Sequence, residues 1–283
     1  MLDRLRYAFK ISRFRFWIYT GGTYVVGYAL GAGEMADFFA LDYYVYLIYF
    51  FFFANVFIYG VNDLFDMSTD EKNPKKEEKE EKLEEGKISD LKWILYFTLA
   101  LSLILLVFQS DWTARIAFIS FLFLSYFYSA EPLRFKSIPI LDFSSNMLYI
   151  VPGIFGFYLA AGELPPILYM IAGFAHISAM HVFSAVPDIK YDRSAGIDTT
   201  AVALGKKRSL ALCISFWSLL AVLTVYLAGF HPLSFIIFIY PIVPSLVLLR
   251  DDIRIEKAYW VLPYINTSLG GLLFVSLLYY NIL

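Results

Sequence analysis

Nine stretches of mostly apolar residues follow one another along this chain of 283 residues. The hydrocarbon core of a bilayer is about 30 Å thick and needs roughly 20 such residues in each crossing helix. Short segments of alternating hydrophobicity, as a β-barrel requires, are absent, so helices must satisfy the backbone. The stretches are 14–33, 43–64, 91–109, 113–130, 141–161, 165–187, 208–229, 232–249 and 259–282. The sequence therefore predicts an all-α integral membrane protein with nine transmembrane helices.

The composition agrees with a chain that lies in a bilayer. Hydrophobic residues make up 59% of it and aromatic residues 19%, which is too apolar for a surface that faces water. The longest polar segment, about 65–90, is too short and too charged to bury its own core. The single cysteine, Cys213, excludes a disulfide framework or a cysteine metal cluster. We therefore predict one membrane domain over residues 1–283, with no removable signal peptide visible at its start.

Lysines and arginines are sorted between the connecting loops. The amino-terminal segment and every second loop hold 21 of the 23, whereas the alternate loops, near 34–42, 110–114, 162–165 and 230–232, hold none. By the positive-inside rule the amino terminus is cytoplasmic, and nine crossings put the carboxyl terminus outside. We expect a multi-pass protein of the cell membrane, with the lipid bilayer and not a nucleic acid as its partner.

The second apolar stretch ends in VNDLFDMSTDE, residues 61–71, which carries three aspartates. Asp63, Asp66 and Asp70 are spaced i, i+3 and i+7, so a helix projects all three from one face. Like charges this close repel one another, and at the carboxyl end of a helix they also oppose its macrodipole. The cluster therefore needs a positive partner.

A second acidic pair lies in VPDIKYDRSAGIDTT, at the end of the sixth stretch. Asp188 and Asp192 are spaced i, i+4, and the topology puts them on the same side of the membrane as the first cluster. Each cluster is followed by a Gly-Lys pair, at 86–87 and 205–206, and then by a new apolar stretch. This weak repeat suggests a four-helix module used twice, with a ninth helix added.

Carboxylates at these spacings suit Mg²⁺, which usually binds one or two of them together with phosphate oxygens. The loop YSAEPLRFKSIP adds Arg134 and Lys136 near Tyr128. These cations either neutralise a polyanion or are ordinary positive-inside residues. A polyanionic head above a bundle of Phe, Tyr and Leu fits a prenyl diphosphate, which Mg²⁺ would help to ionise while the bundle excludes water.

Both acidic motifs resemble those of the UbiA superfamily of intramembrane prenyltransferases. NDLFDMSTD fits the pattern NDxxDxxxD and DIKYD the pattern DxxxD, in the right order, and the resemblance covers essentially the whole chain. It implies a bundle of nine transmembrane helices around a central cavity, with cytoplasmic cap loops over a Mg²⁺-diphosphate site. The implied metal ligands are Asp63, Asp66, Asp70, Asp188 and Asp192, of which all but Asp70 are the expected catalytic residues.

Longer segments look like the branch that contains lycopene elongases, which attach five-carbon units to the ends of a C40 carotenoid. They are SRFRFWIYTGG, YSAEPLRFKSIPILDFSSNMLYIVPG and MHVFSAVPDIKYDRSAGIDTTAVALG. Members with aromatic acceptors often carry YxxxK, whereas Arg134 and Lys136 here follow Tyr128 at six and eight residues. The donor is expected to lie between dimethylallyl and geranylgeranyl diphosphate. The expected substrate-binding residues are Asn62, Tyr128, Arg134, Lys136, Asn146, His181 and Lys190.

Several alternatives stay open at this point. His176 and His181 are five residues apart, a poor metal spacing, so each is first a satisfied intramembrane histidine, although His181 shares the helical face of Asp188. Asn146 either packs helices together or lines the cavity. An aromatic prenyltransferase of quinone synthesis, or an archaeal-type ether-lipid prenyltransferase, would use the same donor chemistry. An ion-coupled transporter is the non-enzyme alternative, because transporters also carry intramembrane carboxylates.

Overall fold

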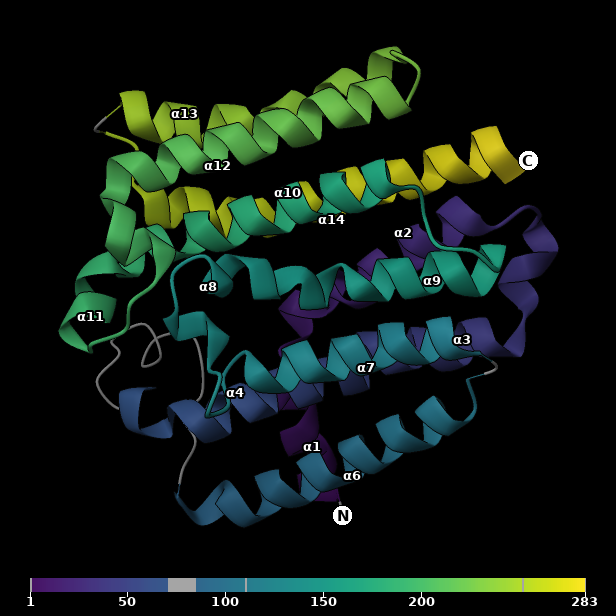
Figure 1. Ribbon diagram of the computed structural model, residues 1–283, viewed down its shortest axis with the longest axis horizontal. Helices are drawn as coiled ribbons and strands as arrows, with labels where there is room; N and C mark the ends of the chain where they lie inside the picture. Colours follow the sequence, from purple (N-terminus) through teal and green to yellow (C-terminus); the bar gives the residue numbers. More distant parts are fainter. Residues whose placement is uncertain (1, 71–84, 110, 251, 283) are drawn as a thin grey trace. The chain divides into compact units, whose positions relative to one another are not determined.

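The computed structural model describes residues 2–70, 85–109, 111–250 and 252–282, and all regular structure within these ranges is helical. The all-helical character predicted from the sequence is thereby confirmed for this part of the chain. The α-helices (Figure 1) are α1 (Leu2–Ile11), α2 (Gly21–Gly31), α3 (Leu41–Ile48), α4 (Ala54–Asp70), α6 (Ile88–Val107), α7 (Trp112–Phe127), α8 (Leu141–Ser144), α9 (Val151–Ala161), α10 (Ile167–Ala185), α11 (Ile189–Ser194), α12 (Thr200–Leu227), α13 (Ile239–Leu249) and α14 (Ile255–Leu277).

Every predicted apolar stretch contains helix, but seven helical segments of the described chain are long and apolar enough to cross a membrane. They are Leu41–Met67, Ile88–Val107, Leu141–Ala161, Ile167–Ser194, Thr200–Leu227, Pro232–Leu249 and Ile255–Tyr280. Helix α7 is apolar but has only 16 residues. The first stretch is not one helix, because the 3₁₀ segment η1 (Phe14–Tyr19) ends at Thr20 before α2 begins. Nine crossings and the cap loops therefore stay predictions, and residues 71–84 lie outside the described part.

The residue contacts divide the chain into two compact units. The first unit contains Met1–Arg134, Val151–Leu164 and Leu273–Leu283, and the second contains Phe135–Ile150 and Pro165–Leu272. The NDxxDxxxD segment belongs to the first unit and the DxxxD segment to the second. A single membrane domain built from a repeated four-helix module stays a prediction.

Glycines let α2 and α9 approach closely in the first unit. A Cβ atom on Gly27 would lie 2.0 Å from the carbonyl oxygen of Gly153, and one on Gly156 would lie 2.5 Å from that of Tyr24. Lipid offers no hydrophobic driving force between helices, so membrane helices associate through close packing of small residues. The two helices run side by side in Figure 1, and only glycine fits where they touch.

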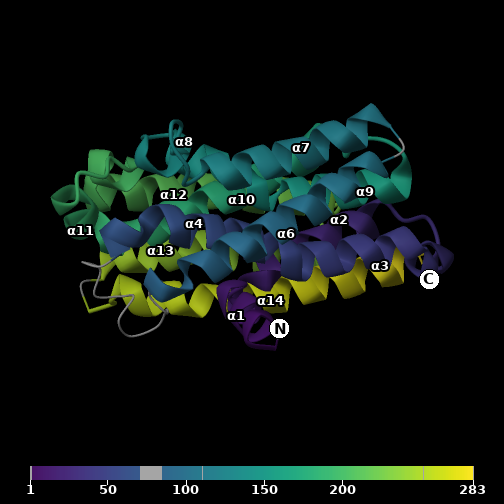
Figure 2. The same cartoon turned by 90° about the horizontal axis from the view of Figure 1, so that it is seen from below.

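Aromatic side chains fill the core of the first unit. Tyr24, Phe50, Phe118 and Phe155 are fully buried, and their rings pack with centroids 5.3 to 6.2 Å apart. The core joins α2, α7 and α9 to the π-helical segment η3 (Tyr49–Phe53) that leads into α4. A π-turn loosens the helical hydrogen bonds, and the side chain of Asn55 compensates by donating to the carbonyls of Phe50 and Phe51. These contacts hold the start of α4, while α6 and α1 lie against it further along (Figure 2).

In the second unit α10 packs along α12, and α12 packs along α13 (Figure 1). Buried Trp217 of α12 donates its indole N–H to Nδ1 of His176 in α10 at 3.3 Å and stacks on Tyr240 of α13. Helix α12 contains a break at Gly205, whose φ of 73° and ψ of 167° are not helical. A short first segment, from Thr200, therefore precedes the membrane-length part of α12.

Candidate functional site

Asp63 of α4 is paired with an arginine that lies 50 residues earlier in the chain. Arg13 Nη2 donates to Asp63 Oδ1 at 2.7 Å, and the two side chains are only 17% and 13% exposed. The guanidinium of Arg13 also lies over the ring of Tyr59, 4.7 Å from its centroid. The sequence placed Arg13 among the positive-inside residues and in the segment SRFRFWIYTGG, but it did not indicate a contact with Asp63, which comes from the fold.

Asp66 lies one turn further along α4 and is 6% exposed. Its Oδ1 accepts from Arg134 Nη2 at 3.2 Å, and its Oδ2 accepts from Asn62 Nδ2 at 2.7 Å. The Asn62 amide also donates to the hydroxyl of buried Ser129 at 3.0 Å. Three residues predicted for the site, Asn62, Asp66 and Arg134, are therefore in direct contact.

Arg13 and Arg134 share an unusual backbone conformation. Their φ angles are 49° and 34°, in the left-handed region that non-glycine residues rarely occupy. This conformation costs roughly 1–2 kcal/mol per residue and persists where the surrounding structure enforces it. One guanidinium reaches half-buried Asp63 and the other reaches buried Asp66, so the strained backbone accompanies the placement of two positive charges beside these carboxylates. These arginines are the positive partners that the spacing of the aspartates requires.

The DxxxD segment lies where α10 ends in the second unit. Asp188 is the last residue of the 3₁₀ segment η7 (Val186–Asp188), and Asp192 belongs to α11. Both aspartates are half-buried, while Lys190 between them is exposed. The backbone carbonyl of Asp192 accepts from the N–H groups of Ala195 and Ile197, which ends α11. The two acids are thus held on a short helical segment at the end of a membrane-length helix.

A second polar cluster of this unit was not predicted. Asp142 of α8 is fully buried, and its carboxylate accepts from both the backbone N–H and the hydroxyl of Thr200 at the start of α12. His181 Nε2 of α10 lies 3.7 Å from Asp142 Oδ2. One feature of the sequence pointed to this cluster, because Asp142 lies inside an apolar stretch, where an ionisable residue is rare. The sequence does not show that Thr200 and His181 are its partners.

The remaining predicted residues have different environments. Tyr128 and Lys136 are half-buried, and Asn146 is buried, with its amide donating to the backbone carbonyl of Asp142. Asn146 is thus tied to its own helical turn, and both alternatives for it, helix packing and cavity lining, stay predictions. The side chain of Asp70 lies outside the described part of the structure.

The donor set on α4 is suited to Mg²⁺. Among the side chains that the structure describes, no three His, Cys, Asp or Glu residues form a group able to bind a metal ion by themselves. Mg²⁺ does not need such a group, because it keeps water ligands and usually binds through one or two carboxylates plus substrate phosphates. Asp63 and Asp66 supply hard oxygen atoms one turn apart, with cationic groups beside them. This arrangement fits a magnesium ion that is bound together with an anionic ligand.

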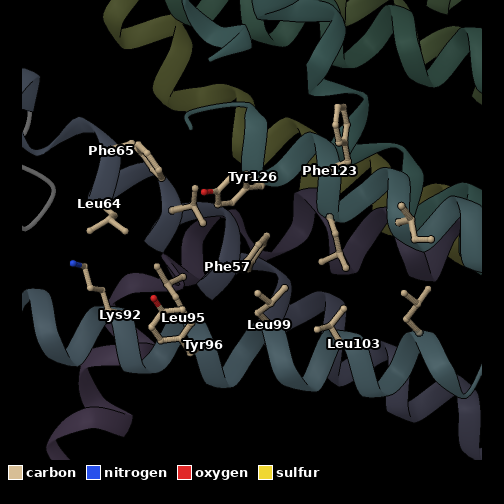
Figure 3. Close-up of a pocket in the computed structure, with 14 residues that line it drawn as sticks. Phe57, Leu64, Phe65, Lys92, Leu95, Tyr96, Leu99, Leu103, Phe123 and Tyr126 are labelled. Carbon is tan, nitrogen blue, oxygen red and sulfur yellow. The ribbon is translucent and has the colours of Figure 1, made fainter. Parts of the chain in front are cut away.

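An apolar groove of about 490 Å³ lies between α4, α6 and α7 of the same unit (Figure 3). Hydrocarbon side chains line most of it, and Lys92, Tyr96 and Tyr126 bring polar atoms to it. Leu64 and Phe65 of α4 line the groove, whereas the neighbouring Asp63 and Asp66 contact Arg13 and Arg134. The groove therefore offers space for an apolar chain, and neither Asp63 nor Asp66 lines it.

The fold and this chemistry define an all-helical membrane protein with arginine-paired carboxylates at a helix end. The model of the UbiA prenyltransferase family matches residues 21–280, so the chain belongs to this family and is a prenyltransferase. Two relatives are lycopene elongase/hydratases. The one from Haloferax volcanii is 39% identical over 277 residues, which cover 98% of this chain and 90% of the relative. The one from Halobacterium salinarum is 36% identical over 265 residues, which cover 94% of each.

Solved structures support the fold. A UbiA homolog from Archaeoglobus fulgidus bound to GPP and Mg²⁺ superposes with a TM-score of 0.71 at 21% identity, over 95% of this chain and 99% of that one. A structure of the same homolog bound to DMAPP and Mg²⁺ gives a TM-score of 0.69 at 20% identity, over 95% and 99% of the two chains. At this identity the likeness concerns the fold, which agrees with the family assignment. The chain is therefore an enzyme and not the ion-coupled transporter considered from its charges.

Proposed function

We propose that this enzyme transfers an isoprenyl group from an allylic prenyl diphosphate to the end of a carotenoid, in a reaction that depends on Mg²⁺. The observation that carries the proposal is the 36–39% identity, over nearly the whole chain, to relatives named lycopene elongase/hydratase. The donor class is supported by the fold neighbours bound to GPP or DMAPP together with Mg²⁺. Quinone and ether-lipid acceptors are the alternatives that the experiment must separate.

The proposed metal ligands are the aspartates of both motifs: Asp63, Asp66, Asp70, Asp188 and Asp192. When bound, Mg²⁺ stabilises the charge that develops on the leaving diphosphate. Arg13 and Arg134 are proposed to donate to phosphate oxygens, because each guanidinium already lies beside a carboxylate of α4. Lys136 and Lys190 are further candidates for this contact, as the sequence predicts.

The apolar interior is proposed to protect the carbocation and to position the acceptor. Ionisation breaks the allylic C–O bond and leaves its electron pair on the diphosphate, so the carbocation must be kept from water until the acceptor attacks. Tyr128 is proposed to stabilise this cation with its ring, while Asn62, Asn146 and His181 contribute polar contacts to the substrates. The acceptor then loses a proton, or adds water and loses a proton, to complete the reaction.

The orientation in the membrane is part of the proposal. The distribution of Lys and Arg supports a cytoplasmic amino terminus, a carboxyl terminus outside, and both acid motifs on the cytoplasmic side. Reporter fusions at the two termini test this arrangement. Both termini on the same side would contradict an odd number of crossings.

The acceptor is tested with purified enzyme in lipid vesicles. Labelled dimethylallyl, geranyl and geranylgeranyl diphosphates are offered with lycopene, a hydroxybenzoate, a dihydroxynaphthoate or geranylgeranylglyceryl phosphate. We expect labelled product from lycopene, and we expect Asp63→Ala and Asp66→Ala to abolish it while the protein still inserts. Prenylation of an aromatic acid or the glycerol phosphate alone would refute the carotenoid assignment, and full activity of either variant would refute the metal site.

A further inference from the structure

Within the cluster of Asp142, Thr200 and His181, only His181 has a role in the function proposed above, as a polar contact to the substrates. Asp142 is 0% exposed, and its carboxylate accepts from Thr200 N at 2.7 Å and from the Thr200 hydroxyl. The Thr200 hydroxyl in turn accepts from the backbone N–H of Ile140 at 2.7 Å. His181 Nε2 faces the same carboxylate at 3.7 Å. The cluster joins α8, α10 and α12 within the second unit.

Anchoring α12 does not by itself require a carboxylate. Asparagine or serine would accept the N–H of Thr200 equally well, since neutral side chains cap helices as effectively as aspartate does. A buried charge is expensive in the membrane unless it is paired, and for this reason an intramembrane ionisable pair indicates a functional site. The partner that uses the charge of Asp142 is His181. At 3.7 Å the contact is longer than a hydrogen bond, but it is within ion-pair range for a protonated imidazole.

His181 lies in α10, upstream of Asp188, and its ring is not fully enclosed. Its side chain is 14% exposed although Val182 and Phe183 beside it are fully buried, so part of the imidazole remains accessible. It precedes Asp188 by seven residues on a continuous helical path, which corresponds to about 10 Å back along α10. A prenyl diphosphate whose head meets Asp188 would extend its hydrocarbon part in this direction.

We propose that His181 is the base that accepts the proton in the last step of transfer, and that Asp142 is its positioning residue. This assignment rests on the proposed function. The π electrons of a terminal double bond of the acceptor form the new C–C bond and leave a tertiary carbocation on the acceptor. Water then forms a C–O bond to that carbon and gives its proton to a ring nitrogen of His181. Without water, a neighbouring C–H gives its proton to the same nitrogen, and its electron pair closes a double bond.

Asp142 contributes by its charge. Its carboxylate stabilises the imidazolium that forms when His181 is protonated, and the two bonds from Thr200 hold the carboxylate in place. The proton leaves His181 for solvent or for the released diphosphate before the next turnover. The cluster thus returns to its starting state with no other reactant consumed.

The test measures coupling, defined as prenylated acceptor formed per diphosphate released, with the full-length enzyme in vesicles. We expect a coupling ratio near one for the wild type. In His181→Gln it should fall at least about tenfold, because a missing general base costs this much or more. Without the base the acceptor cation reverts: the new C–C bond breaks, its electron pair restores the acceptor double bond, and water captures the regenerated allylic cation as prenyl alcohol. Asp142→Asn should show a smaller fall in the same direction. His176→Gln is the matched control, since His176 is also half-buried in α10 but accepts from Trp217.

An unchanged coupling ratio in His181→Gln would overturn the proposal, whether or not the overall rate falls, because a structural or binding role lowers both quantities together. If this variant does not fold, Asp142→Asn decides by the same ratio. A wild type that releases diphosphate without prenylating a carotenoid would refute the acceptor instead. The ratio is then measured with the acceptor that is prenylated, and the same comparison decides the role of His181.

Discussion

Replacing Asp66 with asparagine should have opposite effects on the donor without and with Mg²⁺. The Asp66 side chain is 9% exposed and accepts from Arg134 at 3.2 Å and Asn62 at 2.7 Å. Asparagine preserves the shape and one acceptor oxygen but removes the negative charge. That charge repels a metal-free diphosphate and attracts a magnesium-bound one. The variant should therefore bind the donor more tightly without Mg²⁺ and use it less well with Mg²⁺.

The magnitudes follow from simple electrostatics. At a separation of about 7 Å, one unit charge pair is worth roughly 0.6 kcal/mol in water and about 2.4 kcal/mol at an effective dielectric of about 20. Removing this repulsion should lower the Kd of the metal-free donor by about three- to fiftyfold for each negative charge of the diphosphate that lies near Asp66. Transfer with Mg²⁺ should fall by about 10²- to 10³-fold, the usual effect of losing one group that stabilises developing charge.

Titration calorimetry with geranyl diphosphate in EDTA and in Mg²⁺, followed by a transfer assay, measures both effects. Glu131→Gln is the matched control. Glu131 also faces Arg134, at 3.6 Å, but its side chain is 65% exposed, so its removal should change either quantity little. The reasoning is wrong if Asp66→Asn weakens donor binding in EDTA, or if it transfers at the wild-type rate in Mg²⁺.

Three further predictions concern other parts of the first unit. Gly27→Ala places a Cβ atom 2.0 Å from the Gly153 carbonyl, so the melting temperature in detergent should fall by about 4–8 °C. Arg13→Gln removes the guanidinium beside Asp63, so calorimetry should show donor affinity in Mg²⁺ about ten- to a hundredfold weaker, as for a lost charge-assisted hydrogen bond. Leu99→Trp narrows the groove of Figure 3, yet diphosphate release should stay within about twofold, because the acid cluster does not use the groove.

Each of these predictions has its own control or contrary result. Gly22→Ala, in the same helix, meets only Ile18 at 3.6 Å, so an equal loss of stability there would contradict the packing argument. Arg4→Gln removes an exposed arginine that pairs with Asp90, and an equal loss of donor affinity would mean that surface charge alone explains Arg13. A large loss of diphosphate release in Leu99→Trp would show that the groove takes part in donor use.

Much of the fold was accessible from the sequence, because membrane insertion depends on local properties. About 20 apolar residues cross a bilayer wherever they occur in a chain, so hydropathy located the helices. It did not reveal that the first stretch breaks at Thr20. The hydroxyl of Thr20 donates to the carbonyl of Phe50 at 2.7 Å and accepts from Asn55 at 2.6 Å, contacts that depend on residues 30 and 35 positions away.

The acid motifs were visible because aspartates three or four positions apart lie on the same face of any helix. The sequence by itself thus determined the all-helical class, the two acid motifs and the need for positive charge beside the first. Only the tertiary structure decided that Arg13 meets Asp63 and that Asp142 meets Thr200 and His181. These partners lie 39 to 58 residues apart, and the folded backbone alone determines which distant charges share a low-dielectric environment.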